Sequence, residues 1–309
     1  MASHRMPLLS RWRRVLGCML NQQQRTARCP DSPALDGQLV LLTGGTGGIG
    51  KATARGLLER GAELILPCRN PTRAQALVAD LGAAAERVWP IPLELDDLDS
   101  VAGCIAAIAD RFGNRCIDIL IENAGVWPQS YALTAQGHEI AFGTNVLGHF
   151  ALRRALQRAA LLSPSARVIC VTGDIYILEH ECSPAFRWRG ATGGLKAYCR
   201  SKLGNLWIAA ELQRRFPELT VASVHPGVVA SDLAGPSSGV SGWFKTQLMI
   251  DTTTGAQTSL RCATQPDIEG DGYYHNVRGR VLLTPDDPAA DRTAAARLWD
   301  SCEALANGS

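Results

Sequence analysis

The chain has 309 residues, of which 46% are hydrophobic and 19% are charged. This length allows one large domain with a full hydrophobic core and falls short of the length that usually forces two domains. The formal net charge is +2, and no block of like charge runs through the body of the sequence, so no nucleic-acid partner is expected.

Cysteine usage bears on the cellular compartment, and hydropathy bears on whether the chain spans a membrane. The ten cysteines form no C-x-x-C pair, we expect no secretory leader, and a reducing cytoplasm fits best. The longest early apolar run, Val15 to Leu20, is too short for a membrane span, which needs about 20 residues. The histidines show no ligand spacing, so we expect no metal.

The first 36 residues form an arm before the domain. Apolar residues recur at helical spacing up to Leu20, with four arginines among them, which predicts an amphipathic helix. This helix either makes peripheral contact with a membrane surface or folds against the domain. The polar run 21–36, with Pro30 and Pro33, then indicates a linker, and residues 37–309 form the domain.

From Gln38 onward, short apolar runs alternate with longer segments of helical period. The predicted strands are 39–42, 64–66, 88–93, 117–121, 168–171 and 221–224. The predicted helices are 49–60, 72–81, 98–112, 134–162, 202–216 and 292–305. Strands of this kind, joined by helices, indicate a single α/β domain with a parallel, doubly wound sheet flanked by helices. Residues 231–252, rich in Gly and Ser, indicate a mobile substrate loop or a short helix.

A glycine-rich turn, Thr43-Gly-Gly-Thr-Gly-Gly-Ile-Gly50, follows the first predicted strand. Glycines there allow a tight turn and let backbone N–H groups approach a pyrophosphate, while the next helix N-terminus favours the anion. Because the turn lies at the first strand-to-helix connection, it predicts a dinucleotide site rather than an ordinary loop. The expected contacts in the turn are Thr43, Gly44, Thr46, Gly48, Ile49 and Gly50.

The end of the second strand favours NADP(H) over NAD(H). A NAD site would carry an acid about 20 residues beyond the glycines, to bind the ribose 2′-hydroxyl. Here the residues are Cys68-Arg69-Asn70, and Arg69 can grip a 2′-phosphate with help from Lys51 or Arg73. The alternative is a surface arginine without a ligand.

Further motifs carry a family resemblance. They are Asn123-Ala124-Gly125, Asn145, Tyr198-x3-Lys202 and His225-Pro226-Gly227. In order and spacing, and together with the glycine turn, they resemble the short-chain dehydrogenase/reductase superfamily, and most closely its retinol-dehydrogenase-like subgroup. The resemblance spans about residues 35–305. It implies a Rossmann-type oxidoreductase that moves a hydride between a nicotinamide and a small-molecule carbonyl or alcohol.

Tyr198 is the expected acid–base group. A free tyrosine, with a pKa of about 10, would be poorly tuned at neutral pH. Lys202 lies four residues later on the same helix face, so its ammonium can lower that pKa. The resemblance implies that Lys202 also binds the nicotinamide ribose and that Asn145 holds a water in the proton relay.

The resemblance assigns the remaining cofactor contacts. It implies small residues beside the adenine and ribose, an acid near the adenine, and a hydroxyl at the carboxamide or phosphates. Glu122 stands where the family usually has asparagine, with an effect that the sequence leaves open. Beyond the glycine turn, the expected contacts are Arg69, Glu94, Leu95, Asn123, Ala124, Gly125, Tyr198, Lys202, Pro226, Gly227, Val228 and Ser231.

The fifth strand departs from the family pattern. The family usually has Val-Ser-Ser there, and its second serine hydrogen-bonds the substrate carbonyl, whereas this chain has Gly173. Thr172 can supply the hydroxyl if the strand end is bulged, although strict alternation would turn it away. Asp174 or another loop residue is the second option. The third is that no donor exists and the protein is a slow enzyme, or a dinucleotide-binding sensor or scaffold. We assign Tyr198, Lys202, Asn145 and Thr172 as catalytic.

The sequence also suggests a class of substrate and an oligomeric state. Apolar and aromatic residues such as Trp127, Tyr176 and Trp243-Phe244 suggest a lipophilic carbonyl, retinoid-like or another aldehyde or ketone. The family often dimerises through the helices that follow the fourth and fifth strands, which makes a homodimer a further expectation.

Overall fold

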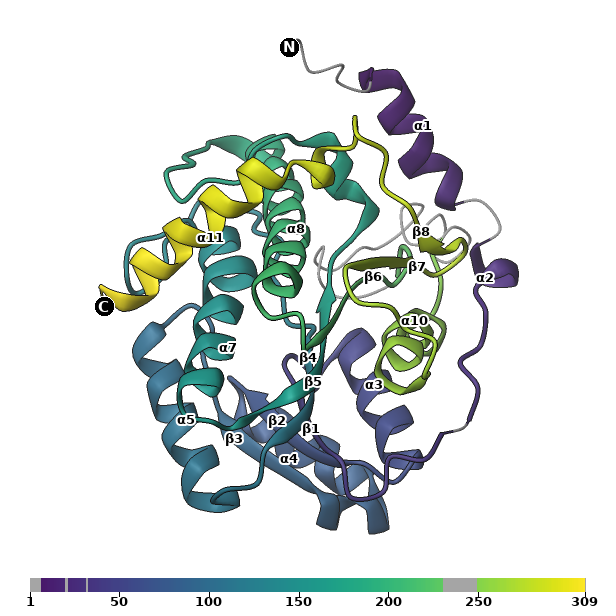
Figure 1. Cartoon of the computed structure of the whole chain (residues 1–309), viewed down its shortest axis with the longest axis vertical. Helices are drawn as coiled ribbons and strands as arrows, with labels where there is room; N and C mark the ends of the chain where they lie inside the picture. The colour runs from purple at the N-terminus through teal and green to yellow at the C-terminus, as the bar shows by residue number, and fades with distance from the viewer. Residues whose placement is uncertain (1–6, 20–21, 32, 230–248, 309) are drawn as a thin grey trace.

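The computed structural model describes residues 7–19, 22–31, 33–229 and 249–308. They form one eight-stranded sheet in the order β3-β2-β1-β4-β5-β6-β7-β8, with helices on both faces (Figure 1). Strands β1 to β7 are parallel, and β8 runs antiparallel to β7. The strands are β1 (Leu39–Leu42), β2 (Glu63–Cys68), β3 (Val88–Pro92), β4 (Ile117–Glu122), β5 (Leu162–Val171), β6 (Thr220–His225), β7 (Gly272–His275) and β8 (Gly279–Val281). The predicted doubly wound α/β fold is confirmed.

Helices cover the sheet in two layers. The helices are α1 (Leu8–Met19), α2 (Gln22–Arg25), α3 (Gly48–Glu59), α4 (Pro71–Asp80), α5 (Leu98–Phe112), α6 (Ile140–Phe142), α7 (His149–Arg158), α8 (Gly190–Arg215), α10 (Thr252–Thr264) and α11 (Arg292–Asn307). Short helical turns are η1 (Gly82–Arg87), η2 (Gly143–Gly148), η3 (Asp174–Leu178) and η5 (Pro288–Ala290). Helices α3, α4 and α10 share one core, and α5, α7, α8 and α11 share the other.

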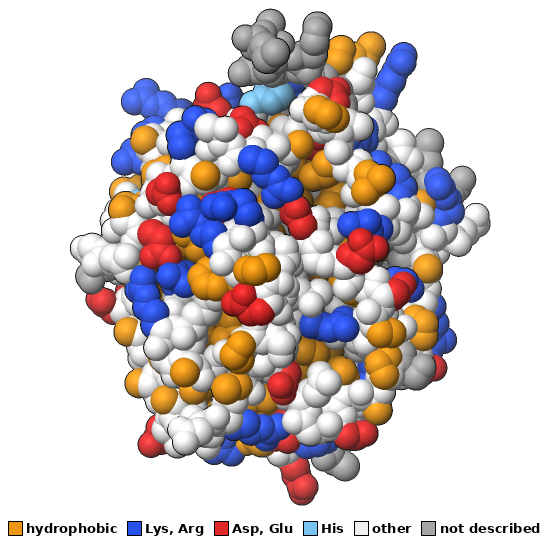
Figure 2. All heavy atoms as spheres, viewed as in Figure 1, with side chains coloured by type: hydrophobic (Ala, Val, Ile, Leu, Met, Phe, Trp, Pro, Cys, Tyr) orange, Lys and Arg blue, Asp and Glu red, His pale blue; other side chains and the backbone are white. Residues whose placement is uncertain are grey.

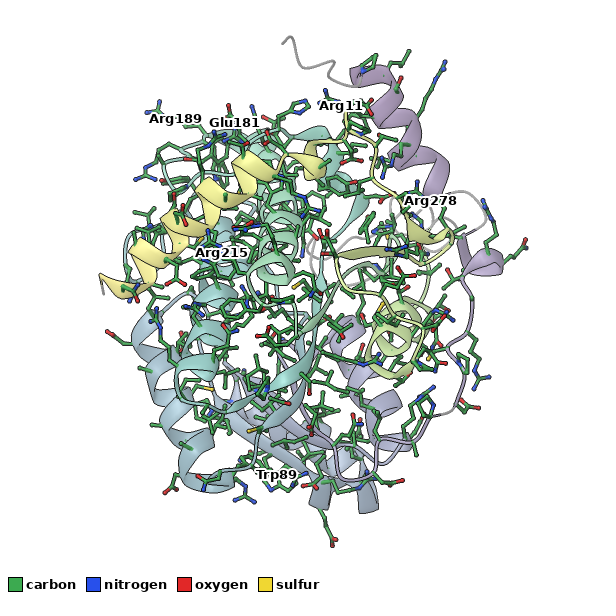
Figure 3. All side chains as sticks on the ribbon, viewed as in Figure 1. Arg11, Trp89, Glu181, Arg189, Arg215 and Arg278 are labelled. Atoms are coloured by element: carbon green, nitrogen blue, oxygen red, sulfur yellow. The ribbon has the colours of Figure 1, made fainter. Side chains whose placement is uncertain are left out.

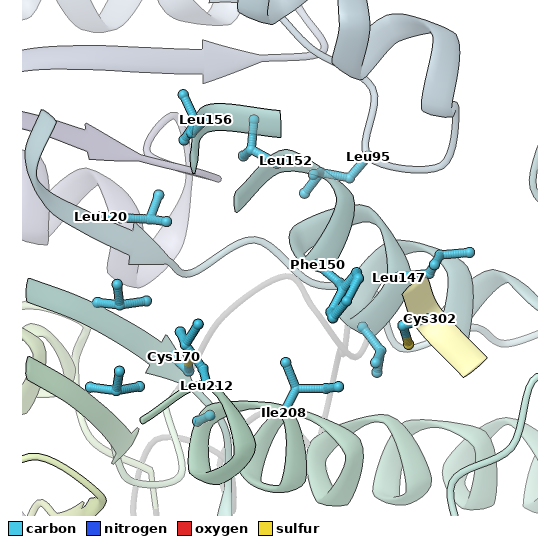
Figure 4. Close-up of a cluster of buried hydrophobic side chains, with 14 of the residues drawn as sticks. Leu95, Leu120, Leu147, Phe150, Leu152, Leu156, Cys170, Ile208, Leu212 and Cys302 are labelled. Atoms are coloured by element: carbon cyan, nitrogen blue, oxygen red, sulfur yellow. The ribbon is translucent and has the colours of Figure 1, made fainter. Parts of the chain in front are cut away.

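Strand β1 shows how the sequence builds both cores. All four of its side chains are buried, and they alternate between the two faces of the sheet. Leu39 and Leu41 face α5, α7 and α8, whereas Val40 and Leu42 face α3 and α10. Figure 4 shows part of the core formed with α5, α7, α8 and α11, to which Phe150 from α7 and Ile208 from α8 both belong.

Several element boundaries differ from the prediction. The predicted helix 134–162 instead begins at Ile140, contains the π-helical turn η2, and ends at Arg158. Ala160 adopts a positive φ of 55°, which stops the helix, and residues 162–167 lengthen β5. Helix α8 begins 12 residues before the predicted start at 202, and α10, β7 and β8 were not predicted.

Helix α11 crosses the outside of α7 and α8 (Figure 1). Its Trp299 is 1% exposed and packs edge-on against Phe150, with ring centres 4.9 Å apart. The chain therefore covers with its own C-terminal helix the face that the family resemblance assigns to dimerisation. A homodimer stays a prediction, and it would need either another face or displacement of α11.

Helix α1 has its polar side toward the domain. Arg11 is 7% exposed (labelled in Figure 3), and Arg14 forms an ion pair with Asp287 at 2.8 Å. Leu9 and Leu16 on the outer side are 66% and 54% exposed. Figure 2 shows apolar and basic side chains together at the top of the molecule, where Figure 1 places α1. None of the described helices is both long and apolar enough to cross a bilayer.

Candidate active site

A cavity of about 440 Å³ lies at the carboxyl ends of the central strands. The predicted residues that line it are Thr43, Gly44, Thr46, Gly48, Ile49, Gly50, Arg69, Glu94, Leu95, Asn123, Ala124, Gly125, Thr172, Tyr198, Lys202 and Pro226. Gly227 and Val228 follow this wall without lining it, and Ser231 lies outside the described residues. The prediction missed Gly47, Pro67, Asn70, Leu93, Asp96, Val126, Thr144 and Val171. Most of these adjoin a predicted residue, so extending each motif by one position would have found them.

The glycine turn forms a close-fitting cradle. Gly44 has a φ of 67°, and a Cβ there would lie 2.8 Å from Ala124 Cα. A Cβ on Gly50 would lie 2.1 Å from the Gly44 carbonyl oxygen. Only glycine fits at both positions, and the N-terminus of α3 follows at Gly48. Such a turn brings backbone N–H groups and a helix dipole to bear on an anion.

A hydrogen-bond chain joins this turn to β4 and to η2. The Thr43 hydroxyl accepts from the backbone N–H groups of Asn123 and Ala124, each at 3.0 Å, and lies 2.9 Å from His149 Nε2. His149 Nδ1 lies 3.1 Å from the Asn145 carbonyl oxygen, which can only accept. His149 therefore carries its proton on Nδ1 and accepts from Thr43, and burial lowers its pKa, which favours this neutral form.

The far end of the cavity carries positive charge. Arg69, at the end of β2, and Arg73, in the first turn of α4, both line it and are exposed. The side chain of Asn70 caps α4 by accepting from Arg73 N at 3.0 Å. Lys51 does not line the cavity and pairs with Asp80 at 2.8 Å, so the predicted assistance falls to Arg73 alone.

Thr144 supplies a polar atom that the fold itself does not use. Its Oγ1 is buried, the residue lines the cavity, and the hydroxyl has no hydrogen-bond partner among the described residues. A buried hydroxyl normally has a partner. Together with the glycine cradle and the two arginines, it fits a bound dinucleotide.

Tyr198 and Lys202 lie side by side on α8. Lys202 Nζ is 5.4 Å from the centre of the Tyr198 ring and donates to the Val171 carbonyl at 3.0 Å. Burial lowers the pKa of Lys202 to about 8. Burial, with the nearby Cys199 thiol, raises the pKa of Tyr198, which is opposite to the direction expected from Lys202. Tyr198 is therefore protonated at neutral pH.

Asn145 ties the loop after β4 to α8. It lies in the π-helical turn η2, a rare feature often found at functional sites. Its side-chain amide accepts from Val126 N at 2.7 Å, donates to Val126 O at 2.9 Å, and donates to Ser201 Oγ at 2.9 Å. Both N–H donors of the Asn145 side chain and one lone pair of its oxygen are therefore used in positioning, and the residue is fully buried.

The hydroxyl of Thr172 bonds the backbone of α8, which argues against the donor role predicted for it. Its hydroxyl donates to the Lys202 carbonyl at 2.8 Å, and the residue is 3% exposed. A hydroxyl has one proton, so this bond leaves none for a substrate carbonyl. Thr172 instead holds the end of β5 against α8. A Cβ on Gly173 would meet nothing closer than His225 Nδ1 at 3.9 Å, so the family's serine would fit here.

Asp174 does not supply the missing donor. Its carboxylate accepts from the Tyr273 hydroxyl, from His275 Nε2 at 3.1 Å and from Arg278 at 2.8 Å. The two histidines that face Asp174, together with hydrogen bonds to its carboxylate, hold its pKa well below the usual range, so it is ionised and can only accept. Tyr176, predicted near the substrate, is fully buried and donates to Asp287 at 3.0 Å.

The same cluster brings together groups that can ligate a metal. Asp174, His225 and His275 offer atoms within 4.8 Å of one another. Within the cluster, Asp174 N donates to His225 Nδ1 at 3.1 Å and His275 Nε2 bonds the Asp174 carboxylate. Arg278, labelled in Figure 3, adds a positive charge beside that carboxylate. This cluster anchors the loop after β5 to β7 and β8.

Glu122 points away from the cavity and into the core. It forms a buried ion pair with Arg153 of α7, and Cys170 Sγ donates to its other oxygen at 3.1 Å. Arg153 is fully buried, and its Nε and Nη2 have no partner within the described part of the chain. The carboxylate at this position therefore balances the charge of a buried arginine in the core, and Glu122 does not line the cavity.

Comparisons with known proteins agree with this geometry. Residues 38–239 match the family model described as short chain dehydrogenase. The chain is 34% identical over 294 residues to retinol dehydrogenase 12 of Mus musculus, covering 90% of this chain and 89% of that protein. The human retinol dehydrogenase 12 is 35% identical over 290 residues, with the same coverage.

Solved structures agree as well. A crystal structure of an uncharacterised protein from Mycobacterium Paratuberculosis has a TM-score of 0.69 and 31% identity, covering 89% of this chain and 95% of that one. A short chain dehydrogenase from Burkholderia cenocepacia, solved in complex with NADP, shares the fold at 23% identity, with a TM-score of 0.64 and coverage of 79% and 97%. The chain belongs to the short-chain dehydrogenase family, whose members are oxidoreductases acting on CH–OH groups with NAD(P).

Proposed function

We propose that this chain is an NADP(H)-dependent reductase of lipophilic aldehydes or ketones. The observation that carries the proposal is one cavity with Tyr198 and Lys202 on its wall and Arg69 and Arg73 also lining it. The arginines suit a 2′-phosphate, since a guanidinium makes charge-assisted, often bidentate hydrogen bonds to phosphate. Arg69 forms no ion pair with any described residue, so its charge is available.

Tyr198 can supply the proton that a carbonyl reduction requires. When bound, the cofactor supplies a hydride to the carbonyl carbon. The π electron pair then moves to the carbonyl oxygen, which needs a proton, and Tyr198 holds one because burial raises its pKa. Lys202 places a positive charge near the phenolate that remains, and solvent returns the proton to Tyr198. Among the described loop residues after β5, neither Thr172 nor Asp174 can donate to the oxyanion.

An aromatic wall beside Tyr198 supports a lipophilic substrate. The Trp127 ring stacks on the Tyr198 ring, with centres 5.2 Å apart and planes within 8°. An apolar ring at this position offers a surface to an apolar carbonyl compound and excludes water from the reacting group. The relatives named retinol dehydrogenases add support for a retinoid-like substrate. The predicted Trp243-Phe244 contacts fall outside the described residues.

A dinucleotide-binding sensor or scaffold without turnover is the second candidate. Two features favour it: Gly173 has no hydroxyl, and the Thr172 hydroxyl already donates to the Lys202 carbonyl. Losing one oxyanion donor typically slows turnover by about 10²–10³. The two functions separate in one experiment, in which NADPH and NADH oxidation are followed with a panel of long-chain, retinoid and aromatic aldehydes. Turnover with NADPH preferred supports the reductase. NADPH binding without turnover on any of these substrates would support the second candidate.

We also propose that the outer face of α1 contacts a membrane surface. Leu9, Trp12 and Leu16 lie on one helix face and are 66%, 40% and 54% exposed, with the exposed Arg13 beside them. Apolar side chains flanked by a basic one suit an interface of anionic lipid. Cosedimentation with vesicles containing phosphatidylserine tests this. A variant with glutamine at all three apolar positions should bind at least tenfold more weakly, and equal binding would contradict the proposal.

A further inference from the structure

The N-terminal segment contacts loops that leave the carboxyl ends of the sheet. The sequence predicts an amphipathic helix and then a linker here, but several side chains make specific hydrogen bonds to the domain. We define the N-terminal strap as residues 8–19 and 22–29. Its contacts come from Arg14 in α1, Gln22 in α2 and Thr26 just after α2. They reach Asp287 and Tyr176, Val228, and Asn276, respectively.

Gln22 holds the loop that follows β6 with both ends of its side-chain amide. Its Nε2 donates to the Val228 carbonyl at 3.1 Å, and its Oε1 accepts from Val228 N at 3.0 Å. Gln22 is only 3% exposed. The two bonds satisfy the donor and the acceptor of one residue, as a neighbouring β-strand does. Ile250 N also donates to the Val228 carbonyl at 3.0 Å, so Gln22 shares the carbonyl with Ile250 and holds the Val228 N–H itself.

The position of Val228 bears directly on the cavity. Pro226, two residues earlier, lines the cavity together with Tyr198. Gly227 between them has a φ of 97°, and a Cβ there would lie 3.0 Å from Gln22 Oε1 and 2.6 Å from Ile250. Gly227 is therefore closely enclosed, and only one residue separates Val228 from Pro226 at the cavity wall.

Thr26 strengthens the same attachment. Its hydroxyl accepts from Asn276 Nδ2 at 2.9 Å, and Asn276 N donates at 3.2 Å to the carbonyl of His225, the last residue of β6. The strap therefore contacts the chain on both sides of Pro226, at Val228 directly and at His225 through Asn276.

Arg14 extends the strap to the loop after β5. It donates to Asp287 at 2.8 Å and to the Tyr176 hydroxyl at 3.1 Å. Tyr176 lies in η3, which begins at Asp174, two residues beyond Thr172 of the cavity wall. The strap thus reaches the loops that leave β5 and β6, and Lys202 donates to Val171 at the end of β5.

We propose that Gln22 is a positioning residue for the cofactor, acting through Val228 to hold Pro226 at the cavity wall. This inference rests on the proposed binding of NADP(H). No residue of the strap lines the cavity. The inference therefore makes the N-terminal segment a structural support of the binding site.

The chain offers a matched control for the test. Gln23 follows Gln22 in α2 and is exposed. Gln22→Ala should weaken NADPH binding about tenfold in a fluorescence titration well below the melting temperature, because two hydrogen bonds are lost. Gln23→Ala should bind NADPH as the wild-type protein does. Equal affinity in the Gln22→Ala and wild-type proteins would overturn the inference.

Gln22→Glu separates positioning from a general loss of stability. An ionised carboxylate accepts from Val228 N but cannot donate to Val228 O, whereas a protonated carboxyl does both. Burial and the facing Val228 carbonyl should raise the pKa of the new carboxyl above its usual value of about 4.3. The NADPH affinity of Gln22→Glu, taken relative to wild type at each pH, should therefore recover as pH falls from about 8 to about 5. A ratio that does not change with pH would overturn the inference. A wild-type protein that binds no NADP(H) would overturn the proposed function as well, whereas failure of the glutamine variants alone leaves that function standing.

Discussion

Replacing Glu122 by glutamine should destabilise the fold strongly, because it leaves the Arg153 guanidinium buried without a counter-charge. Arg153 is fully buried, Glu122 is 6% exposed, and within the described residues Arg153 makes its side-chain hydrogen bond to Glu122 alone. Removing one partner of a buried ion pair costs about 3–5 kcal/mol, far more than an exposed pair is worth.

The expected cost can be converted into a melting temperature. Unfolding entropy is about 2.1 cal/mol/K per residue, or roughly 0.65 kcal/mol/K for a chain of 309 residues. A loss of about 3–5 kcal/mol should therefore lower Tm by about 5–8 °C. Differential scanning calorimetry of the wild-type and Glu122→Gln proteins at neutral pH measures this shift.

A double variant supplies the control. Glu122→Gln combined with Arg153→Met removes both charges and keeps similar volumes, so it should recover most of the lost stability. A Glu122→Gln protein that melts within about 1 °C of wild type would refute the reasoning. So would a double variant that is less stable than Glu122→Gln, because the penalty would then not come from an unpaired charge.

Three other variants test the site. Arg69→Ala should lower kcat/KM with NADPH by more than about tenfold and leave NADH almost unchanged, since a charged contact is worth about 1.5–3 kcal/mol; equal losses with both would contradict the assignment. A Cβ on Gly173 would meet no atom closer than 3.9 Å, so Gly173→Ser should fold, and its hydroxyl should raise turnover by up to about 10²–10³, the usual effect of one oxyanion donor; unchanged turnover would show that no substrate carbonyl lies there. Burial lowers the pKa of His225 from 6.5 to about 4. The unfolded chain then binds a proton that the folded chain resists, so stability should fall by up to about 3 kcal/mol as pH drops through that window. His225→Asn, which keeps an acceptor for Asp174 N, should flatten that loss in urea unfolding.

Local patterns predicted most of the fold because they report burial. Strands such as Leu39–Leu42 are apolar at every position, which marks a strand buried on both faces. The same reasoning failed at 134–162, where helical periodicity continues past Ala160 although that residue ends the helix with a positive φ. Local apolar spacing does not indicate such a stop.

The site was predictable where one motif supplies its own geometry. The glycine turn fixes a backbone shape, and the Tyr198-x3-Lys202 spacing places two side chains on one helix face. Neither depends on distant residues. Thr172 differs, because its hydroxyl donates its proton in a hydrogen bond to a carbonyl 30 residues away on α8. Gln22 differs even more, since its partner Val228 lies 206 residues along the chain.

Tyr198 is the proposed proton donor in an NADPH-dependent carbonyl reduction. The most direct test is the rate of NADPH oxidation with a lipophilic aldehyde in the wild-type and Tyr198→Phe proteins, with NADPH affinity measured for both. The account predicts turnover in the wild type and a fall of about 10²–10⁴ in the variant at unchanged NADPH affinity. A Tyr198→Phe protein that keeps most of the wild-type rate would contradict it.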